Sequence, residues 1–260
     1  MNHRPKHTDT AALPLSKLLE PAESPEECFI RASCELDLIE QIMLGFEFCG
    51  SYASSPGSPR GFSERDPLTS PSKLQSSIEK AGGQRGIKQT RRALACIKAN
   101  SASPGETGMA MLLSMPHMLG GLNLKGSHLN YEIKLGKRAR TMFGKNSFRC
   151  DMYWPEFKLA VEYESDLCHT GAESIANDSK RRNALLFLGN TVITITRKQM
   201  NSFPEMNKAA QIIASHLGQR LRPRTKDFPA KQFALRSAVL SGTSARSGHF
   251  LRLAGQNFRF

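Results

Sequence analysis

The chain has 260 residues, of which 39% are hydrophobic and 23% charged, and its formal net charge at pH 7 is +13. This length allows one sizeable domain or two small ones, and such an excess of positive charge is typical of a protein that binds a polyanion such as nucleic acid. No apolar run follows the first residues, so we expect no signal peptide. No stretch of about 18 apolar residues occurs, so we expect no membrane span.

The cysteine pattern argues against a structural zinc site. The chain contains no Cys-x-x-Cys pair, which disfavours a zinc ribbon and favours reduced thiols in a cytosol. The six cysteines are Cys28, Cys34, Cys49, Cys96, Cys150 and Cys168. We therefore expect a cytoplasmic protein.

Residues 1–86 are expected to form a mainly helical accessory region after a loose lead-in over residues 1–22. Ser24, Pro25 and Glu27 form a capping box with proline at the first helical position, so a helix should start there. A second helix is indicated by apolar residues three or four positions apart, namely Leu36, Ile39, Met43 and Phe46.

Residues 51–72 are dense in serine, proline and glycine and are expected to form a long loop. The segment is either a linker or an ordered crossing. Its Arg60 and Arg65 could touch a phosphate, but solvated loop charges are the favoured interpretation.

A core domain is expected over residues 87–220, and it opens with two helices. Residues 86–100 place apolar side chains on one helical side and basic ones on the other, which predicts an amphipathic helix. Ser103, Pro104 and Glu106 begin the next helix, which runs until Pro116.

A basic run covers residues 134–149 and leads directly into Asp151. We expect this run to draw in a phosphate backbone in a salt-dependent way; a solvated loop and strand edge is the alternative. Its cations are Lys134, Lys137, Arg138, Arg140, Lys145 and Arg149.

Two short apolar-rich runs, residues 148–154 and 159–163, predict a β-hairpin. A turn centred between Glu156 and Phe157 places Asp151 opposite Glu162. Opposed like charges about 5 Å apart are destabilising, and a divalent cation between them would relieve that repulsion. The spacing alone also fits an ordinary hairpin with its acids on the wet face.

The residues after the hairpin complete an α/β pattern. Residues 177–188 predict a helix, residues 192–196 a buried strand and residues 202–217 a last helix. The fold class is therefore α/β, with a mixed central sheet flanked by helices and a mainly helical N-terminal region. Residues 221–260 are rich in arginine and lysine and are expected to form a flexible C-terminal arm that binds through its positive charge.

The ordered motifs over about residues 103–196 resemble the PD-(D/E)XK nuclease superfamily, and in particular the domain group similar to very-short-patch-repair endonucleases. They are Asp151, Glu162-Tyr163-Glu164, His169, Asp178-Ser179-Lys180-Arg181, Leu185 and Gly189, in that order. The resemblance implies a restriction-endonuclease-like core that binds Mg²⁺ or Mn²⁺ through Asp151 and Glu162. It also implies that Glu106 adds a third acid to the metal site. The alternative is that Glu106 only satisfies a backbone N–H as the third helical residue of a capping box, and both roles can hold in part.

The chain departs from the superfamily pattern at Glu164, where a lysine usually positions or deprotonates the attacking water. Glu164 could add a metal ligand, His169 could act as the base, or Lys158 on the same strand face could do so. The site could also be inactive. Arg181 is expected to form an ion pair with Asp178 or to contact a phosphate.

The sequence as a whole favours a metal-dependent endonuclease, with DNA as the expected substrate. The expected catalytic residues are Asp151, Glu162, Glu164 and His169, and the expected metal ligands are Glu106, Asp151 and Glu162. The expected nucleic-acid contacts are the six cations of the basic run together with Arg181 and Arg182. The alternative is a non-catalytic, antitoxin-like nucleic-acid-binding regulator on the same fold, which would gain nothing from converging carboxylates.

Overall fold

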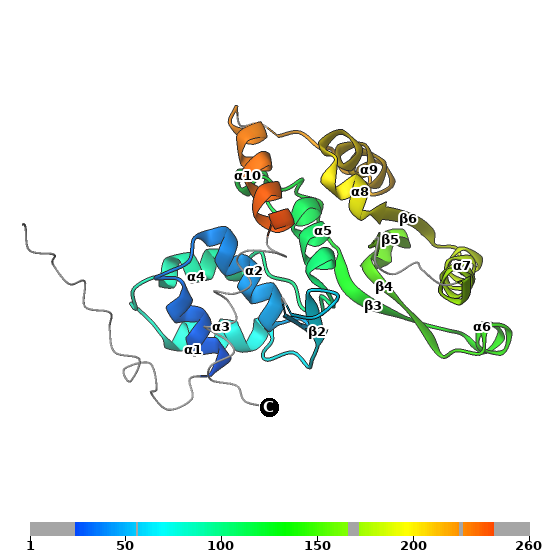
Figure 1. Cartoon of the computed structure of the whole chain (residues 1–260), viewed down its shortest axis with the longest axis horizontal. Coiled ribbons are helices and arrows are strands. Elements are labelled where there is room, and N and C mark those ends of the chain that lie inside the picture. The colour runs from blue at the N-terminus through cyan, green and yellow to red at the C-terminus, as the bar shows by residue number, and fades with distance from the viewer. Residues whose placement is uncertain (1–23, 56, 166–171, 224–225, 242–260) are drawn as a thin grey trace, which may run out of the picture.

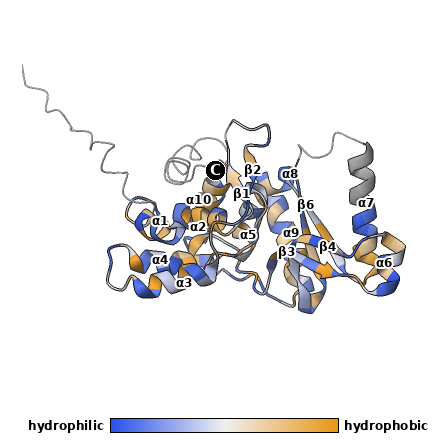
Figure 2. Ribbon diagram, turned by 90° about the horizontal axis from the view of Figure 1, so that it is seen from below, coloured by the Kyte–Doolittle hydropathy of each residue, from blue (hydrophilic) through white to orange (hydrophobic). Residues whose placement is uncertain are grey.

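The structure is a computed structural model that describes residues 24–55, 57–165, 172–223 and 226–241, without the side chains of 172–178 and 241. Four helices gather at one end of the molecule (Figure 1): α1 (Pro25–Ala32), α2 (Leu38–Phe48), α3 (Pro71–Lys80) and α4 (Ile87–Leu94). The predicted capping box at Ser24 is confirmed, and Asp37 with Glu40 forms another before α2. Polar and apolar stretches alternate along α3 and α4 (Figure 2), as in surface helices that cover a core.

The serine- and proline-rich segment after α2 is an ordered crossing. It contains an antiparallel ribbon of β1 (Tyr52–Ser54) and β2 (Phe62–Glu64), and α3 begins inside the expected loop at Pro71. The ribbon is tied down because the Tyr52 hydroxyl lies 2.9 Å from that of Thr107, and the Glu47 carboxylate accepts hydrogen bonds from Ser54.

A mixed four-stranded sheet forms the other end of the molecule. Its order is β3 (His128–Lys134), β4 (Ser147–Trp154), β5 (Leu159–Glu164) and β6 (Thr191–Thr196). The first two pairs are antiparallel and the last is parallel. The predicted α/β class, mixed sheet and flanking helices are therefore confirmed, whereas β3 was not anticipated.

Helices cover both faces of the sheet. Alternate residues of β5 enter different clusters: Leu159 and Val161 pack with α5 (Pro104–Ser114), and Ala160 packs with α7 (Ala172–Phe187). Both α5 and α7 were predicted, although α7 starts earlier than expected. The remaining elements are η2 (His117–Leu119), α6 (Lys137–Phe143), η3 (Pro155–Phe157), α8 (Arg197–Asn201), α9 (Phe203–His216) and α10 (Phe228–Ser241).

The prediction of a flexible C-terminal arm is wrong for residues 228–241, which form α10. Leu235 and Val239 are buried in the main core, and the helix packs against α5 and η2. Gly120, with φ of +88°, allows this packing because an added Cβ would lie 2.3 Å from the Lys231 carbonyl oxygen. The helix was missed because Gln232 and Arg236 interrupt its buried face, where Arg236 donates to the Met200 carbonyl oxygen over 2.9 Å.

The main core joins the helical end to the sheet. One cluster runs from Phe29 and Phe46 through Met109 to Met152 and Ile195. The expected domain boundary at residue 87 falls inside this packing, since α4 contacts α2 and α3. No helix among the described residues is long and apolar enough to cross a bilayer.

Candidate functional site

The β4–β5 hairpin has the register that the sequence predicted. Met152 pairs with Val161, and Trp154 pairs with Leu159, across the η3 turn. Continuing that register by one residue places Asp151 opposite Glu162. The backbone N–H of Tyr163 donates to Asp151 Oδ2 over 2.7 Å, which fixes the Asp151 carboxylate at the start of this pairing.

A break in the sheet lies beside Asp151. In a regular strand residues two apart share a face, yet Leu129 and Tyr131 pack into different clusters, as do Cys150 and Met152. Asn130 lies between the first two with φ of +44°, a left-handed conformation that asparagine tolerates better than most residues. Asp151 therefore lies at the point where the side chains of β3 and β4 change from one face of the sheet to the other, and not in a regular ladder.

Glu106 reaches this break from the first turn of α5. Its Oε2 accepts hydrogen bonds from the Ala102 N–H (2.9 Å) and from Asn130 Nδ2 (2.6 Å). The Ser103 hydroxyl donates to Oε1 over 3.0 Å and accepts from the Glu106 N–H over 3.1 Å, so Ser103 caps α5. The Glu106 carboxylate satisfies the N–H of Ala102 rather than that of Ser103, so the expected capping box is only partly formed. Burial, followed by the negative charge of Asp151, raises the pKa of Glu106 to about 7.

The close approach of α5 to the sheet depends on Gly105. A Cβ at this position would lie 2.2 Å from the aromatic ring of Tyr163. The helix therefore rests directly on β5, and this contact holds the carboxyl group of Glu106 near Asp151.

Glu162 is buried on the α7 side of the sheet, with only 7% of the residue exposed. Arg181 Nη2 lies 2.8 Å from Glu162 Oε2 and forms an ion pair with it. Apart from Arg181 and the thiol of Cys150, neither carboxylate oxygen has a hydrogen-bond partner among the described residues. Burial first, and then the charge of Asp151, raises the pKa of Glu162 to about 7, although Arg181 opposes the shift.

The described residues do not form a complete chelating cluster. No group of three or more histidine, cysteine, aspartate or glutamate side chains within them lies close enough to hold one metal ion. Mg²⁺ usually needs only one or two carboxylates, because waters and substrate phosphates supply its other ligands. Asp151 with a neighbouring glutamate is compatible with that requirement.

The remaining expected catalytic residues are less informative. Glu164 is half-buried at the end of β5, two residues beyond Glu162. His169 lies outside the described residues, as does the side chain of Asp178. The expectation that Lys158 shares the strand face is wrong, because it lies in the turn before β5 with φ of +45°.

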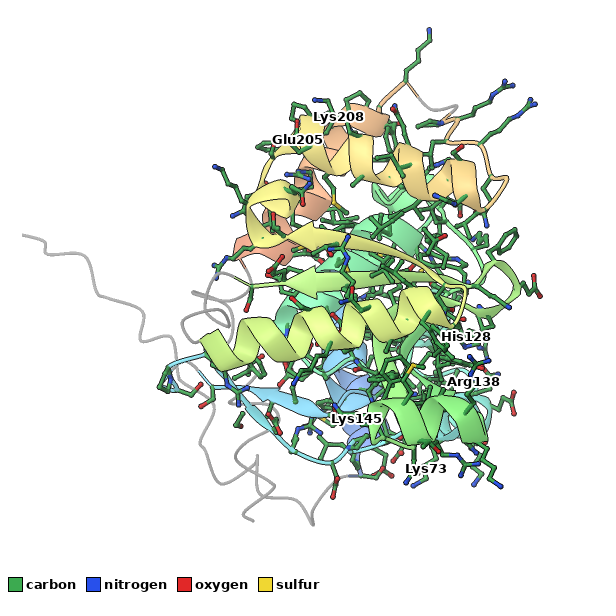
Figure 3. The ribbon with its side chains drawn as sticks, turned by 90° about the vertical axis from the view of Figure 1, so that its right-hand side faces the viewer. Lys73, His128, Arg138, Lys145, Glu205 and Lys208 are labelled. Atoms are coloured by element: carbon green, nitrogen blue, oxygen red, sulfur yellow. The ribbon has the colours of Figure 1, made fainter. Side chains whose placement is uncertain are left out.

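The predicted basic contacts fall into three places. Lys134, Lys137, Arg138, Arg140 and Lys145 are exposed on the end of β3, on α6 and on the loop that follows, and we call them the basic arm. Arg138 and Lys145 lie on and beside α6 (Figure 3), which contacts α7 through the rings of Phe143 and Phe187.

The other three cations lie nearer the acids. Arg149 is exposed on β4. Arg181 is held by Glu162, and Arg182 reaches the Thr194 hydroxyl over 3.5 Å. The ion pair of Arg181 therefore joins it to a proposed metal ligand, Glu162, rather than leaving it free for a phosphate.

A cleft of about 800 Å³ opens beside Glu106. Its walls are the β1–β2 ribbon, the start of α5, parts of β4 and β5, α8 and the end of α10. The charged side chains in its lining are Arg60, Glu64, Arg65, Asp66, Glu106, Arg149 and Arg197. Sequence reasoning missed Arg197, because the cleft forms from segments that are far apart in the chain.

Comparison with known proteins gives relatives but no function. The chain is 30% identical over 146 residues to uncharacterized proteins from two strains of Mycobacterium tuberculosis. The match covers 56% of this chain and 48% of each relative, so the chain spans about half the length of the curated relatives it matches. No family model and no solved structure matches.

Proposed function

We propose that this chain is a metal-dependent endonuclease that hydrolyses phosphodiester bonds, with DNA as its expected substrate. One observation carries the proposal: the hairpin register places Asp151 opposite the buried Glu162, and Glu106 reaches the same break in the sheet from α5. Burial first, and then the charge of Asp151, raises the pKa of both glutamates. Three acids in mutual repulsion disfavour the ionised apo protein. A bound divalent cation would offset that repulsion.

The alternative of an ordinary hairpin fits these positions poorly. It would place its acids on the wet face, whereas Glu162 is 7% exposed and forms an ion pair with Arg181 of α7. Burying a carboxylate is costly unless it is paired or binds a metal. Arg181 neutralises Glu162 in part, but Asp151 also faces Glu106, which accepts its hydrogen bonds from neutral amide and hydroxyl donors.

Phosphodiester hydrolysis needs an activated water and neutralisation of the phosphate charge. Asp151 and Glu162 would hold the cation, with Glu106 contributing through a water. Bound there, Mg²⁺ or Mn²⁺ would stabilise charge on the phosphate and lower the pKa of a bound water. The Tyr163 N–H keeps the Asp151 carboxylate in place, and Glu164 and His169 remain the candidates to accept the proton of the water.

The charge distribution supports a nucleic-acid substrate. The five cations of the basic arm are exposed at the tip of the β3–β4 hairpin, and Arg149 continues the positive surface along β4 to the cleft. Contacts of such cations with phosphates supply affinity that falls as salt rises. They would bring a strand to the acids without reading its sequence.

The test is a cleavage assay of the wild-type chain on several DNA and RNA substrates, in Mg²⁺, in Mn²⁺ and in EDTA. We expect divalent-dependent cleavage that Glu156→Gln, an exposed acid in the same hairpin turn, leaves unchanged. Cleavage of no substrate above the EDTA background would end the nuclease proposal. A nucleic-acid-binding regulator would then take its place.

A further inference from the structure

The cleft beside Glu106 has the dimensions of a single strand rather than of a duplex. Its volume of about 800 Å³ lies within the roughly 300–1,000 Å³ range of pockets for small ligands. A space of that volume takes a few nucleotides of one strand and not a length of double helix.

The cleft also carries two cations that are available for a phosphate backbone. Arg149 on β4 and Arg197 on α8 line it from the sheet side and have no acidic partner among the described residues. Arg65 lines it too, but its guanidinium is committed to the carbonyl oxygens of Glu47 and Asp66. Arg60 pairs with Glu64 over 3.2 Å.

Aromatic rings lie in the same lining. Phe62 of the ribbon is half-buried, with the Arg60 guanidinium 5.0 Å from its ring centroid, and Tyr163 lies on the sheet side against Gly105. Proteins that bind single strands combine a positive groove with aromatic side chains on which bases stack. The cleft holds both features, and Glu106 is part of its lining.

We propose that the cleft between the β1–β2 ribbon and the sheet binds a single nucleic-acid strand, with Arg149 and Arg197 on its phosphates and Phe62 against a base. This deepens the proposed function and rests on it, because it makes the nuclease substrate a single-stranded region or a frayed end led to Glu106 and Asp151. It also gives the ribbon a role through Phe62. Arg65, expected to be a solvated loop charge, is instead half-buried and donates to the carbonyl oxygens of Glu47 and Asp66.

The test measures binding in EDTA, where no cleavage occurs, by fluorescence anisotropy of the full chain. The probes are a labelled single strand of DNA, the matching single strand of RNA and the DNA duplex. We expect a single strand of at least one kind to bind about tenfold more tightly than the duplex. Equal or tighter binding of the duplex would overturn the inference.

Matched variants locate the binding. Arg197→Ala and Phe62→Ala should each weaken single-strand binding about fivefold or more, the effect of removing one stacked base or one phosphate partner. Lys198→Ala, on the same helix but outside the cleft lining, and Phe157→Ala, an exposed ring in the hairpin turn, should leave binding unchanged. Cleft variants that behave like these controls would overturn the inference.

The two proposals fail in different ways. Selective single-strand binding without divalent-dependent cleavage would support the cleft and end the nuclease proposal. Duplex cleavage with no preference for a single strand, and no effect of Arg197→Ala, would support the nuclease and end the cleft proposal.

Discussion

At the scale of residues, Asp151 is the centre of the site. It lies at a break in the sheet, next to the Tyr163 N–H and close enough to Glu106 and Glu162 to raise the pKa of both. Burial alone would shift these pKa values upward, and the negative charge of Asp151 adds to the shift. The apo protein therefore holds an electrostatic strain that depends on pH.

We predict that the apo protein loses stability as pH rises from about 4.5 to about 8. Glu106 and Glu162 have folded-state pKa values of about 7, above their usual 4.5, so the unfolded chain releases these protons first. Their stabilisation is complete below pH 4.5 and is lost as pH rises through 7. The loss should be on the order of 1–3 kcal/mol, or several degrees in the thermal midpoint.

Two comparisons by calorimetry check this dependence. Glu162→Gln should flatten the profile between pH 5 and pH 8, and Mg²⁺ should raise the midpoint at pH 8 more than at pH 5. If the thermal midpoint of the wild-type apo protein rises between pH 5 and pH 8, the pKa values of Glu106 and Glu162 are not raised in the folded state.

Arg181 should matter most when Glu162 is ionised. Arg181→Met leaves a buried carboxylate without its cation, so we expect a loss of about 1–3 kcal/mol at pH 8 and a smaller one at pH 5. Arg182→Met, on the exposed next position of α7, is the matched control and should have little effect at either pH. Equal losses at both pH values would indicate that Arg181 contributes packing rather than charge.

At the scale of elements, the β3–β4 hairpin with α6 is the part that extends away from the core toward its basic tip (Figure 1). Replacing four exposed cations of the basic arm, Lys137, Arg138, Arg140 and Lys145, by alanine should flatten the salt dependence of nucleic-acid binding. The slope should fall by about 1 for each phosphate that the variant no longer neutralises.

A charge-matched variant controls for net charge. Removing Lys73, Lys80, Lys88 and Arg91, which are exposed on α3 and α4, should leave the slope nearly unchanged. Equal effects of the two variants would mean that overall charge, and not the arm, governs binding.

The sequence predicted the elements whose signals are local. The hairpin register followed from a short turn between two apolar runs, and α5 and α9 followed from serine caps with proline next to them. The edge strand β3 was not recognised, because the alternation of its buried and exposed residues is broken at Asn130. Before Asn130 the strand packs through Leu129 into the main core, and after it through Tyr131 and Ile133 into the cluster on the α7 side. The cleft and Arg197 could not be predicted from the sequence, because no local pattern indicates that α8 and the ribbon line the same cleft.

At the scale of the whole molecule, α10 packs against α5 and ends at Ser241. A chain that ends there keeps α10 and its packing against α5, so we expect it to fold and to lose only the affinity supplied by Arg246, Arg252 and Arg259. A chain that ends at residue 221 also loses the buried Leu235 and Val239. It should unfold at a clearly lower temperature, since burying such side chains contributes about 1.5–3 kcal/mol each.

Thermal unfolding and binding of the two truncations separate these roles. If the chain ending at residue 221 were as stable as the chain ending at Ser241, α10 would not belong to the core. An unchanged affinity on removal of residues 242–260 would show that the last arginines do not touch nucleic acid.

If Asp151 serves chemistry and not affinity, the most direct measurement compares cleavage and binding by the wild type and by Asp151→Asn. The substitution removes a metal charge and also removes repulsion against the phosphate. We therefore predict that divalent-dependent cleavage is abolished while binding to the same nucleic acid in EDTA is equal or tighter. The apo midpoint at pH 8 should rise slightly, because the repulsion with Glu106 and Glu162 is relieved. Cleavage by Asp151→Asn at the wild-type rate, or a loss of binding in parallel with cleavage, would contradict this role of Asp151.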